Sequence, residues 1–126
     1  VDQPIGRHPA DRKRMTVRPD GRQAQTKYKI QRSGLGGTLV ELYPNTGRTH
    51  QLRVHMKFLG CPIVGDPVYG HKKKAGKGEL ERIYANFPGI ALHAGRLEFT
   101  HPTTGEWMQF EAPLPELFQS VIERLK

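Results

Sequence analysis

Residues 45–70 hold most of the side chains in this sequence whose types and spacing could do chemistry. Within the ten residues 46–55 of this segment lie two arginines, two histidines, a glutamine and two threonines, beside a glycine turn. Arg48 and Arg53 supply guanidinium groups, which bind carboxylates and phosphates through paired N–H donors. A single arginine is most often a solvated surface cation, but this clustering favours a site for an anion.

A short helix is expected to position these side chains. Thr49 occupies the position of an N-cap, so the helix is predicted to begin near His50. One face of the helix has apolar spacing and consists of Leu52, His55, Met56 and Leu59. Gly60 is predicted to stop the helix, and Pro62 prevents its continuation. Arg53 then lies on a different face, and the N–H groups at the helix start favour a phosphate or a carboxylate there.

The run T-G-R-T-H-Q-L-R-V-H-M, followed by G-C-P-I-V-G-D-P-V-Y-G, resembles the signature of the RluA/RluD-type ribosomal RNA pseudouridine synthases. Three further stretches resemble the same family: V-D-Q-P-I with R-H-P near the start, A-Q-T-K-Y at 24–28, and L-H-A with H-P at 92–102. The resemblance implies an enzyme that breaks the glycosidic bond of a uridine, turns the base and rejoins it through C5. It implies no cofactor and no metal.

The sequence departs from that family's pattern at the catalytic residue. No H-R-L-D motif, which carries the family's catalytic aspartate, occurs in the chain, and a K-x-Y-x-A segment with a base-stacking tyrosine is also missing. The chain therefore resembles the C-terminal half of a catalytic domain whose N-terminal half is its missing partner. We expect the chain to be inactive on its own.

The resemblance implies catalytic roles for two residues. Arg53 matches the arginine that pairs with the catalytic aspartate, and a guanidinium keeps such a carboxylate ionised and oriented. Leu92 matches an apolar wall beside the target base. Without its aspartate, Arg53 is expected to be exposed or to hold a solvent anion. Asp66 lies in a G-D-P context that predicts a tight-loop residue and not a replacement nucleophile.

Positive charge is concentrated toward the N-terminus. The net charge is +8, and residues 1–32 carry nine Lys or Arg against three Asp, whereas residues 90–126 carry three against five Glu. A basic side of this kind fits a polyanion such as RNA, although the same charge can serve solubility alone. We expect RNA contacts, mostly to phosphates, from Arg7, Arg12, Lys13, Arg14, Arg48, His50, Lys72, Lys73 and Lys74.

Neither a nucleotide loop nor a metal site is predicted. The segment H-K-K-K-A-G-K-G at 71–78 lacks the spacing and the hydroxyl residue of a P-loop, so a basic loop is the better interpretation. Six histidines invite a metal, but His50 and His55 lie on different helix faces and no H-E-x-x-H occurs. We expect His93 and His101 to hydrogen-bond in or near a sheet instead.

The pattern of elements predicts an α+β fold with an antiparallel-rich mixed sheet of two hairpins. Alternating residues predict one hairpin from 24–31 and 38–43 and another from 90–100 and 107–112, with the short helix between them. An amphipathic helix is predicted from Pro115 onward, with an apolar face of Phe118, Val121, Ile122 and Leu125. We expect residues 1–126 to form a single unit.

No apolar run approaches the length of a membrane span, and we expect a cytoplasmic monomer that binds RNA and no membrane. The alternative to an enzyme part is a non-catalytic, basic RNA-binding module. A protein-interaction domain is a third class, which would need an exposed apolar patch.

Overall fold

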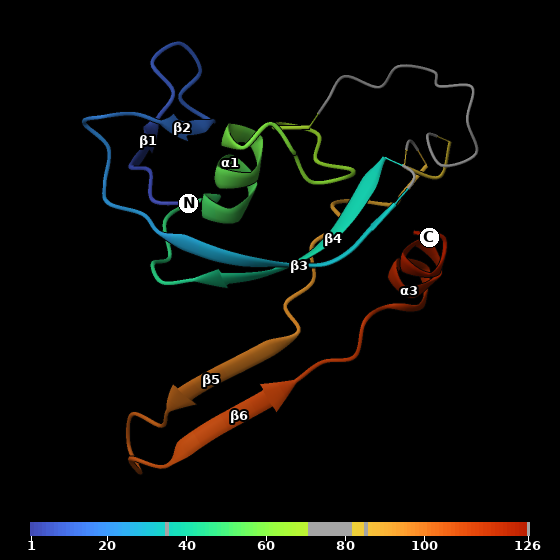
Figure 1. The fold of residues 1–126 in the computed structure, drawn as a ribbon. Coiled ribbons are helices and arrows are strands. Elements are labelled where there is room, and N and C mark those ends of the chain that lie inside the picture. Colours follow the sequence, from blue (N-terminus) through green and yellow to red (C-terminus); the bar gives the residue numbers. More distant parts are fainter. Residues whose placement is uncertain (35, 71–81, 85, 126) are drawn as a thin grey trace. The chain divides into compact units, whose positions relative to one another are not determined.

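The computed structural model describes residues 1–34, 36–70, 82–84 and 86–125 (Figure 1). The chain divides into two compact units, one formed by residues 1–91 with Leu125 and the other by Leu92–Arg124. The first unit contains two antiparallel strand pairs and the second contains one, and both contain helical segments, so the predicted α+β class is confirmed. Whether residues 1–126 act as the single unit that we expected stays a prediction.

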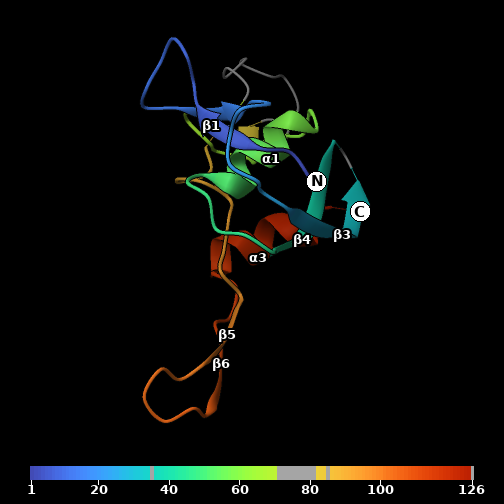
Figure 2. The ribbon, with the colours of Figure 1, turned by 90° about the vertical axis from the view of Figure 1, so that its left-hand side faces the viewer.

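The first unit contains two strand pairs and a helix. β1 (Ile5–Arg7) pairs with β2 (Met15–Val17), and β3 (Thr26–Gly34) pairs with β4 (Gly37–Pro44) as the predicted first hairpin. The β1–β2 pair adds a third hairpin to the two that were predicted. Helix α1 (Gln51–Phe58) packs against β2, β3 and β4, and Figures 1 and 2 both show it beside β1 and β2.

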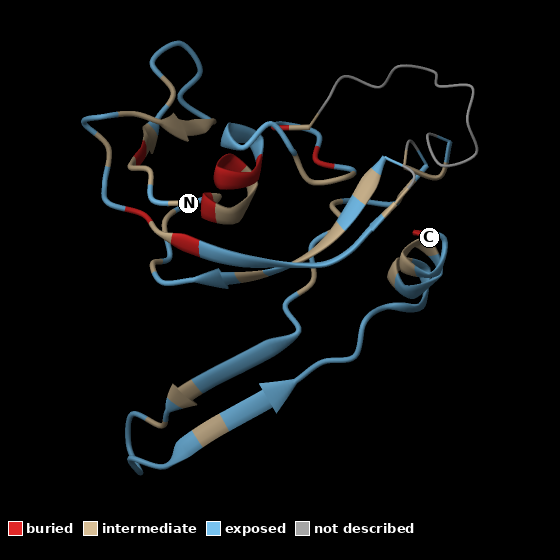
Figure 3. Cartoon of the chain, viewed as in Figure 1, coloured by how far each residue is buried: buried red, intermediate tan, exposed pale blue. Residues whose placement is uncertain are grey.

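The core of the first unit lies between α1 and the β1–β2 pair. It consists of Ile5, Ala24, Val54 and Tyr69, with Met15 and Val17 packed against it. Figure 3 shows buried residues on α1 and on the segments next to it. This small core therefore fixes the position of α1, which carries Arg53 and His55 and directly follows Arg48 and His50.

The end of α1 forms as the sequence predicts. Gly60 has a positive φ of 78° and lies just after the C-cap Leu59. The N–H of Gly60 donates to the carbonyl oxygen of Lys57, and the N–H of Cys61 donates to that of Met56. These two bonds satisfy carbonyls that a helix end leaves open, the arrangement of a Schellman motif.

The start of α1 differs from the prediction. The N-cap is His50, in the left-handed region at φ 54°, and no side chain caps the helix, so the predicted cap by Thr49 is wrong. The Gln51 side chain shapes the turn instead, because its Oε1 accepts from the Arg48 N–H at 3.0 Å and from Thr46 Oγ1 at 2.7 Å. A fully hydrogen-bonded amide can be buried at little cost.

The buried face of α1 is also shifted from the predicted one. His55 and Met56 are buried as expected, but Leu59 is 41% exposed. The other buried positions are Gln51 and Val54. Apolar periodicity missed Gln51 because its burial depends on hydrogen bonds to residues far away in the sequence.

The second unit consists of β5 (Arg96–Thr100), paired with β6 (Trp107–Glu111), and α3 (Glu116–Glu123). The hairpin and the C-terminal helix are those predicted, although β5 begins at Arg96 and not at residue 90. His93 Nε2 lies 3.0 Å from the Ala112 carbonyl oxygen, and His101 Nδ1 accepts from the N–H groups of Thr103 and Thr104. The expectation for these two histidines is therefore confirmed.

Candidate active site

Arg53 forms a two-point ion pair with Asp66. Its Nε donates to Asp66 Oδ2 at 2.8 Å, and its Nη2 donates to Oδ1 at 2.9 Å. The Asp66 side chain is 0% exposed and that of Arg53 16%. The expectation that Arg53 is exposed or holds a solvent anion is therefore wrong, because the chain supplies a buried carboxylate of its own.

A tight loop holds Asp66 in place, as its G-D-P context predicts. Asp66 Oδ1 also accepts from the backbone N–H groups of Val68 and Tyr69, both at 3.0 Å. Gly65 has a positive φ of 79°, and a side chain there would collide with the carbonyl oxygen of Gly89. Glycine is therefore required beside the aspartate, and the carboxylate has little freedom to move.

Both members of the ion pair stay charged. Burial alone would raise the pKa of Asp66, but hydrogen bonds from Arg53, Tyr69 and Val68 outweigh it and lower the pKa to about 2. The hydrogen bond to Asp66 raises the pKa of Arg53 above its usual value. At neutral pH the pair is thus a fixed carboxylate beside a fixed guanidinium.

Tyr69 forms an aromatic platform at this pair. The guanidinium carbon of Arg53 lies 4.9 Å from the centre of the Tyr69 ring, and that of Arg14 lies 5.5 Å from it. Cations near an aromatic face are attracted by the electron density of the ring. Arg14 Nε is buried and has no hydrogen-bond partner among the described residues.

The Tyr69 hydroxyl links the platform to His50. Its oxygen accepts from the Met15 N–H at 2.9 Å and lies 2.8 Å from His50 Nδ1. Burial and the nearby charge of Arg53 lower the pKa of His50, against an opposing effect of Asp66. A neutral His50 can accept the Tyr69 hydrogen at Nδ1, which ties the first turn of α1 to the loop that carries Asp66.

A second polar network lies buried beneath α1. Thr26 Oγ1 lies 2.8 Å from His55 Nδ1 and accepts from Gln51 Nε2 at 3.0 Å. His55 Nε2 lies 2.9 Å from the carbonyl oxygen of Gln3. Since a carbonyl can only accept, Nε2 carries the hydrogen, and in a neutral imidazole ring Nδ1 then accepts from the Thr26 hydroxyl. These contacts hold α1 against β3 and the N-terminal segment.

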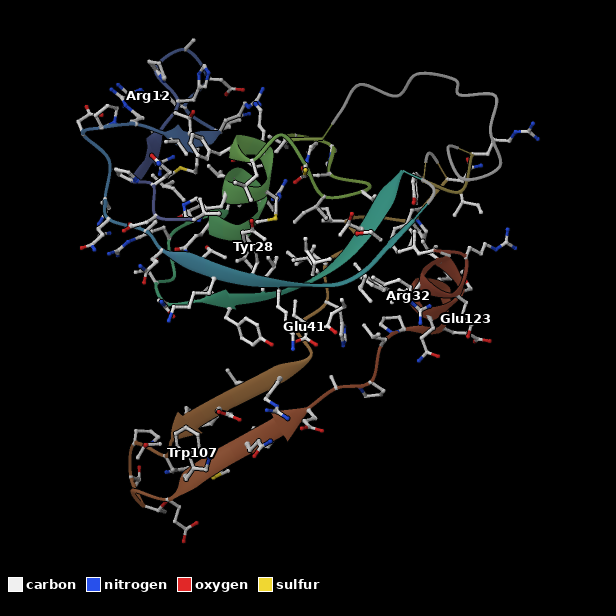
Figure 4. The ribbon with its side chains drawn as sticks, in the orientation of Figure 1. Arg12, Tyr28, Arg32, Glu41, Trp107 and Glu123 are labelled. Carbon is white, nitrogen blue, oxygen red and sulfur yellow. The ribbon has the colours of Figure 1, made fainter. Side chains whose placement is uncertain are left out.

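The predicted RNA-contacting residues of the β1–β2 connection lie in different settings. Arg12 and Lys13 are exposed, and Figure 4 shows Arg12 on that connection. Arg7 Nη1 donates to the Arg12 carbonyl oxygen at 2.9 Å, and His8 Nδ1 accepts from the N–H groups of residues 10 and 11. Arg14 instead folds over Tyr69. The structure thus supports a shaped, basic loop, and its contacts with RNA stay a prediction.

The remaining predicted residues are spread more widely. Arg48 is half-buried, and its Nε donates to the Gln23 carbonyl oxygen at 2.8 Å. Leu92 is 40% exposed and belongs to the second unit. Lys72, Lys73 and Lys74 lie outside the described residues. The contacts of these side chains with RNA or with the target base stay predictions.

Among the described residues, no three His, Cys, Asp or Glu side chains gather as they would around a metal ion. The described helices also include none that is long and apolar enough to cross a membrane. Sequence reasoning missed Asp66 and Tyr69 as partners of Arg53. The signal was present in G-D-P-V-Y-G, which follows the helix closely and holds an acid between two turn-forming residues.

Residues 1–58 match the model of a family described as RNA pseudouridylate synthase. Over its full length the chain is 48% identical to the RNA pseudouridine synthase YlyB of Bacillus subtilis, of which it covers 38%. It is 47% identical to ribosomal large subunit pseudouridine synthase D of Xanthomonas campestris, of which it covers 39%. The chain thus spans about two-fifths of the length of these relatives.

A solved structure also resembles this chain. Human RNA pseudouridylate synthase domain containing 4 aligns with a TM-score of 0.73 at 32% sequence identity. The alignment covers 99% of this chain and 55% of the human one.

Proposed function

We propose that this chain belongs to the RNA pseudouridylate synthase family and that it forms the C-terminal part of a catalytic domain that converts uridine to pseudouridine in ribosomal RNA. The observation that carries the proposal is an identity of 43–48% with pseudouridine synthases across the whole chain. Several of those relatives are named for the large ribosomal subunit. We place the activity in the cytoplasm, in a monomer.

The proposed reaction needs no cofactor. The bond between C1′ and N1 of the uridine breaks, the base turns, and a bond between C1′ and C5 forms. The hydrogen on C5 then leaves to solvent as a proton, and N1 takes up a proton from solvent. Arg53 would support this reaction by holding a catalytic aspartate from another part of the protein. Its guanidinium is already fixed by Asp66 and Tyr69, so little further ordering is required when a second carboxylate binds. Leu92 would contribute the apolar wall of the base pocket.

The target uridine must first leave its stack, which costs a few kcal/mol. Contacts with RNA phosphates can offset this cost, and the exposed Arg12 and Lys13 are suited to them. The side chains of Arg7 and His8 hydrogen-bond to the backbone of this loop and hold its shape. Arg12 and Lys13 therefore lie on an ordered connection.

The second candidate function is a non-catalytic RNA-binding module. The absence of H-R-L-D from this sequence favours it for the chain taken alone. Such a module would share the basic loop but would have no use for a fixed Arg53.

Release of tritium from RNA that carries C5-labelled uridine separates the two functions. We expect release by the full-length protein that contains this chain and an H-R-L-D segment, and none by residues 1–126 alone. Release by the isolated chain would show that the catalytic residue lies within it. A full-length protein that binds RNA and releases no tritium would favour the module.

A further inference from the structure

We propose that Asp66 is a positioning residue for catalysis: it occupies one edge of the Arg53 guanidinium and presents the opposite edge to a second carboxylate. This inference deepens the proposed function and rests on it. Asp66 itself touches no reacting atom in this account, and acts only through Arg53.

The hydrogen-bond geometry divides the guanidinium into two edges. Arginine has five N–H donors in a planar fork. Asp66 takes the edge formed by Nε and Nη2. Among the described residues, nothing else bonds to Arg53, so both hydrogens of Nη1 and the second hydrogen of Nη2 stay available. The end formed by Nη1 and Nη2 can therefore bind one more carboxylate through two parallel hydrogen bonds.

The two side chains of the pair are buried to different extents, and the guanidinium is the partner that still reaches solvent. The Asp66 carboxylate is 0% exposed, whereas Arg53 keeps 16% of its side-chain surface. Here the carboxylate lies on the inner side and the unoccupied end of the guanidinium belongs to the partner that keeps solvent contact.

The residues around the ion pair fix this orientation. Two backbone N–H groups hold Asp66, and the Tyr69 ring lies against the guanidinium. The Tyr69 hydroxyl is bonded in turn to Met15 and His50. Rotation of the Arg53 head would break both bonds to a buried carboxylate, which is strongly unfavourable.

Two carboxylates on one guanidinium also influence each other. A nearby negative charge disfavours ionisation, so Asp66 holds the pKa of the second carboxylate higher than Arg53 alone would. Removal of the Asp66 charge should therefore shift the acidic limb of the pH profile of kcat/KM to lower pH. A residue that only stabilised the fold would leave that limb in place.

The test uses the full-length enzyme with Asp66→Ala, Asp66→Asn and Asp66→Glu, assayed by tritium release below the melting temperature of each variant. Asp66→Ala frees the Arg53 head, and we expect kcat to fall about 10²-fold while KM for RNA changes little, since a displacement of about 1 Å at a catalytic group has this effect. Asp66→Asn keeps the shape and should move the acidic limb of kcat/KM to lower pH. Asp66→Glu keeps the charge but moves the guanidinium, so kcat should fall with the limb unshifted.

Asp20→Asn is the matched control. Asp20 pairs with Arg18 through the same Nε and Nη2 edge, at 2.8 and 3.0 Å, but is exposed. We expect wild-type kcat and an unshifted acidic limb for this variant. Wild-type kcat in Asp66→Ala, or an unshifted limb in Asp66→Asn, would overturn the positioning role alone. A wild-type enzyme that released no tritium would refute the proposed function and this inference with it.

Discussion

Replacement of Thr26 by valine should destabilise the first unit by about 2 kcal/mol. Valine has nearly the same shape but lacks the hydroxyl, which is fully buried and bonds to both His55 Nδ1 and Gln51 Nε2. Gln51 Nε2 keeps a second partner, the Gln25 carbonyl oxygen at 2.9 Å. His55 Nδ1 keeps none among the described residues, and a buried polar atom left without a partner costs about 1–3 kcal/mol.

Urea unfolding of the chain measures this effect. With a slope of about 1–2 kcal/mol per molar urea, a loss of about 2 kcal/mol lowers the midpoint by about 1–2 M. Circular dichroism should follow the transition, because Trp107 is 64% exposed in the second unit and its fluorescence would not report on the first.

Thr38→Val provides the matched control for this prediction. It removes a hydroxyl of the same residue type from β4, but Thr38 is exposed and its Ser33 partner lies 3.3 Å away. Exposed substitutions of this kind usually change stability by less than about 0.5 kcal/mol. Equal midpoints for the two variants would refute the reasoning about the buried network.

Three further predictions concern pH, backbone and charge. Because folding lowers the pKa of Asp66 from 3.8 to about 2, the ionised pair should contribute about 2 kcal/mol to the free energy of unfolding at neutral pH. This contribution should be lost as pH falls from about 4 to about 2, as measured by the unfolding free energy over that range, and Asp66→Asn should abolish the pH dependence. Gly65→Ala should lower the urea midpoint, because alanine at φ 79° would collide with Gly89; an unchanged midpoint would mean that the loop adjusts. Arg12→Glu combined with Lys13→Glu should weaken RNA binding by the chain more than the same change at Lys27 and Lys29, and wild-type affinity should fall steeply between about 50 and about 200 mM salt in fluorescence anisotropy; affinity independent of salt would contradict phosphate contacts.

Local patterns were sufficient for the parts of the fold that depend on neighbouring residues. The turn at Gly60, the β3–β4 hairpin and the C-terminal helix follow from glycine chemistry and from apolar spacing. Their causes lie within a few residues, where spacing and backbone preference act directly.

Contacts between distant residues limited the prediction of the site. Asp66 was correctly placed in a tight loop, but its bond to Arg53 spans 13 residues and depends on how that loop folds back. The Gln51 amide was not expected inside, because its partners, the first residue of β3 and the residue before it, are 25 and 26 residues away. The spacing of residues along a helix does not depend on partners so distant in the sequence. It therefore predicted an apolar face where a polar network is buried.

Turnover of Arg53 variants tests the central claim, that this chain supplies a fixed arginine to a pseudouridine synthase. In the full-length enzyme, Arg53→Ala should lower tritium release by about 10²–10⁴-fold, since an uncompensated carboxylate costs about 3–5 kcal/mol. Arg53→Lys should fail largely as well, because an ammonium cannot form the planar fork. The double variant Arg53→Ala with Asp66→Asn removes the buried unpaired charge, so it should melt higher than Arg53→Ala and still be inactive. Arg48→Ala should instead change RNA affinity more than turnover. Near-normal tritium release by a folded Arg53→Ala enzyme would contradict the account.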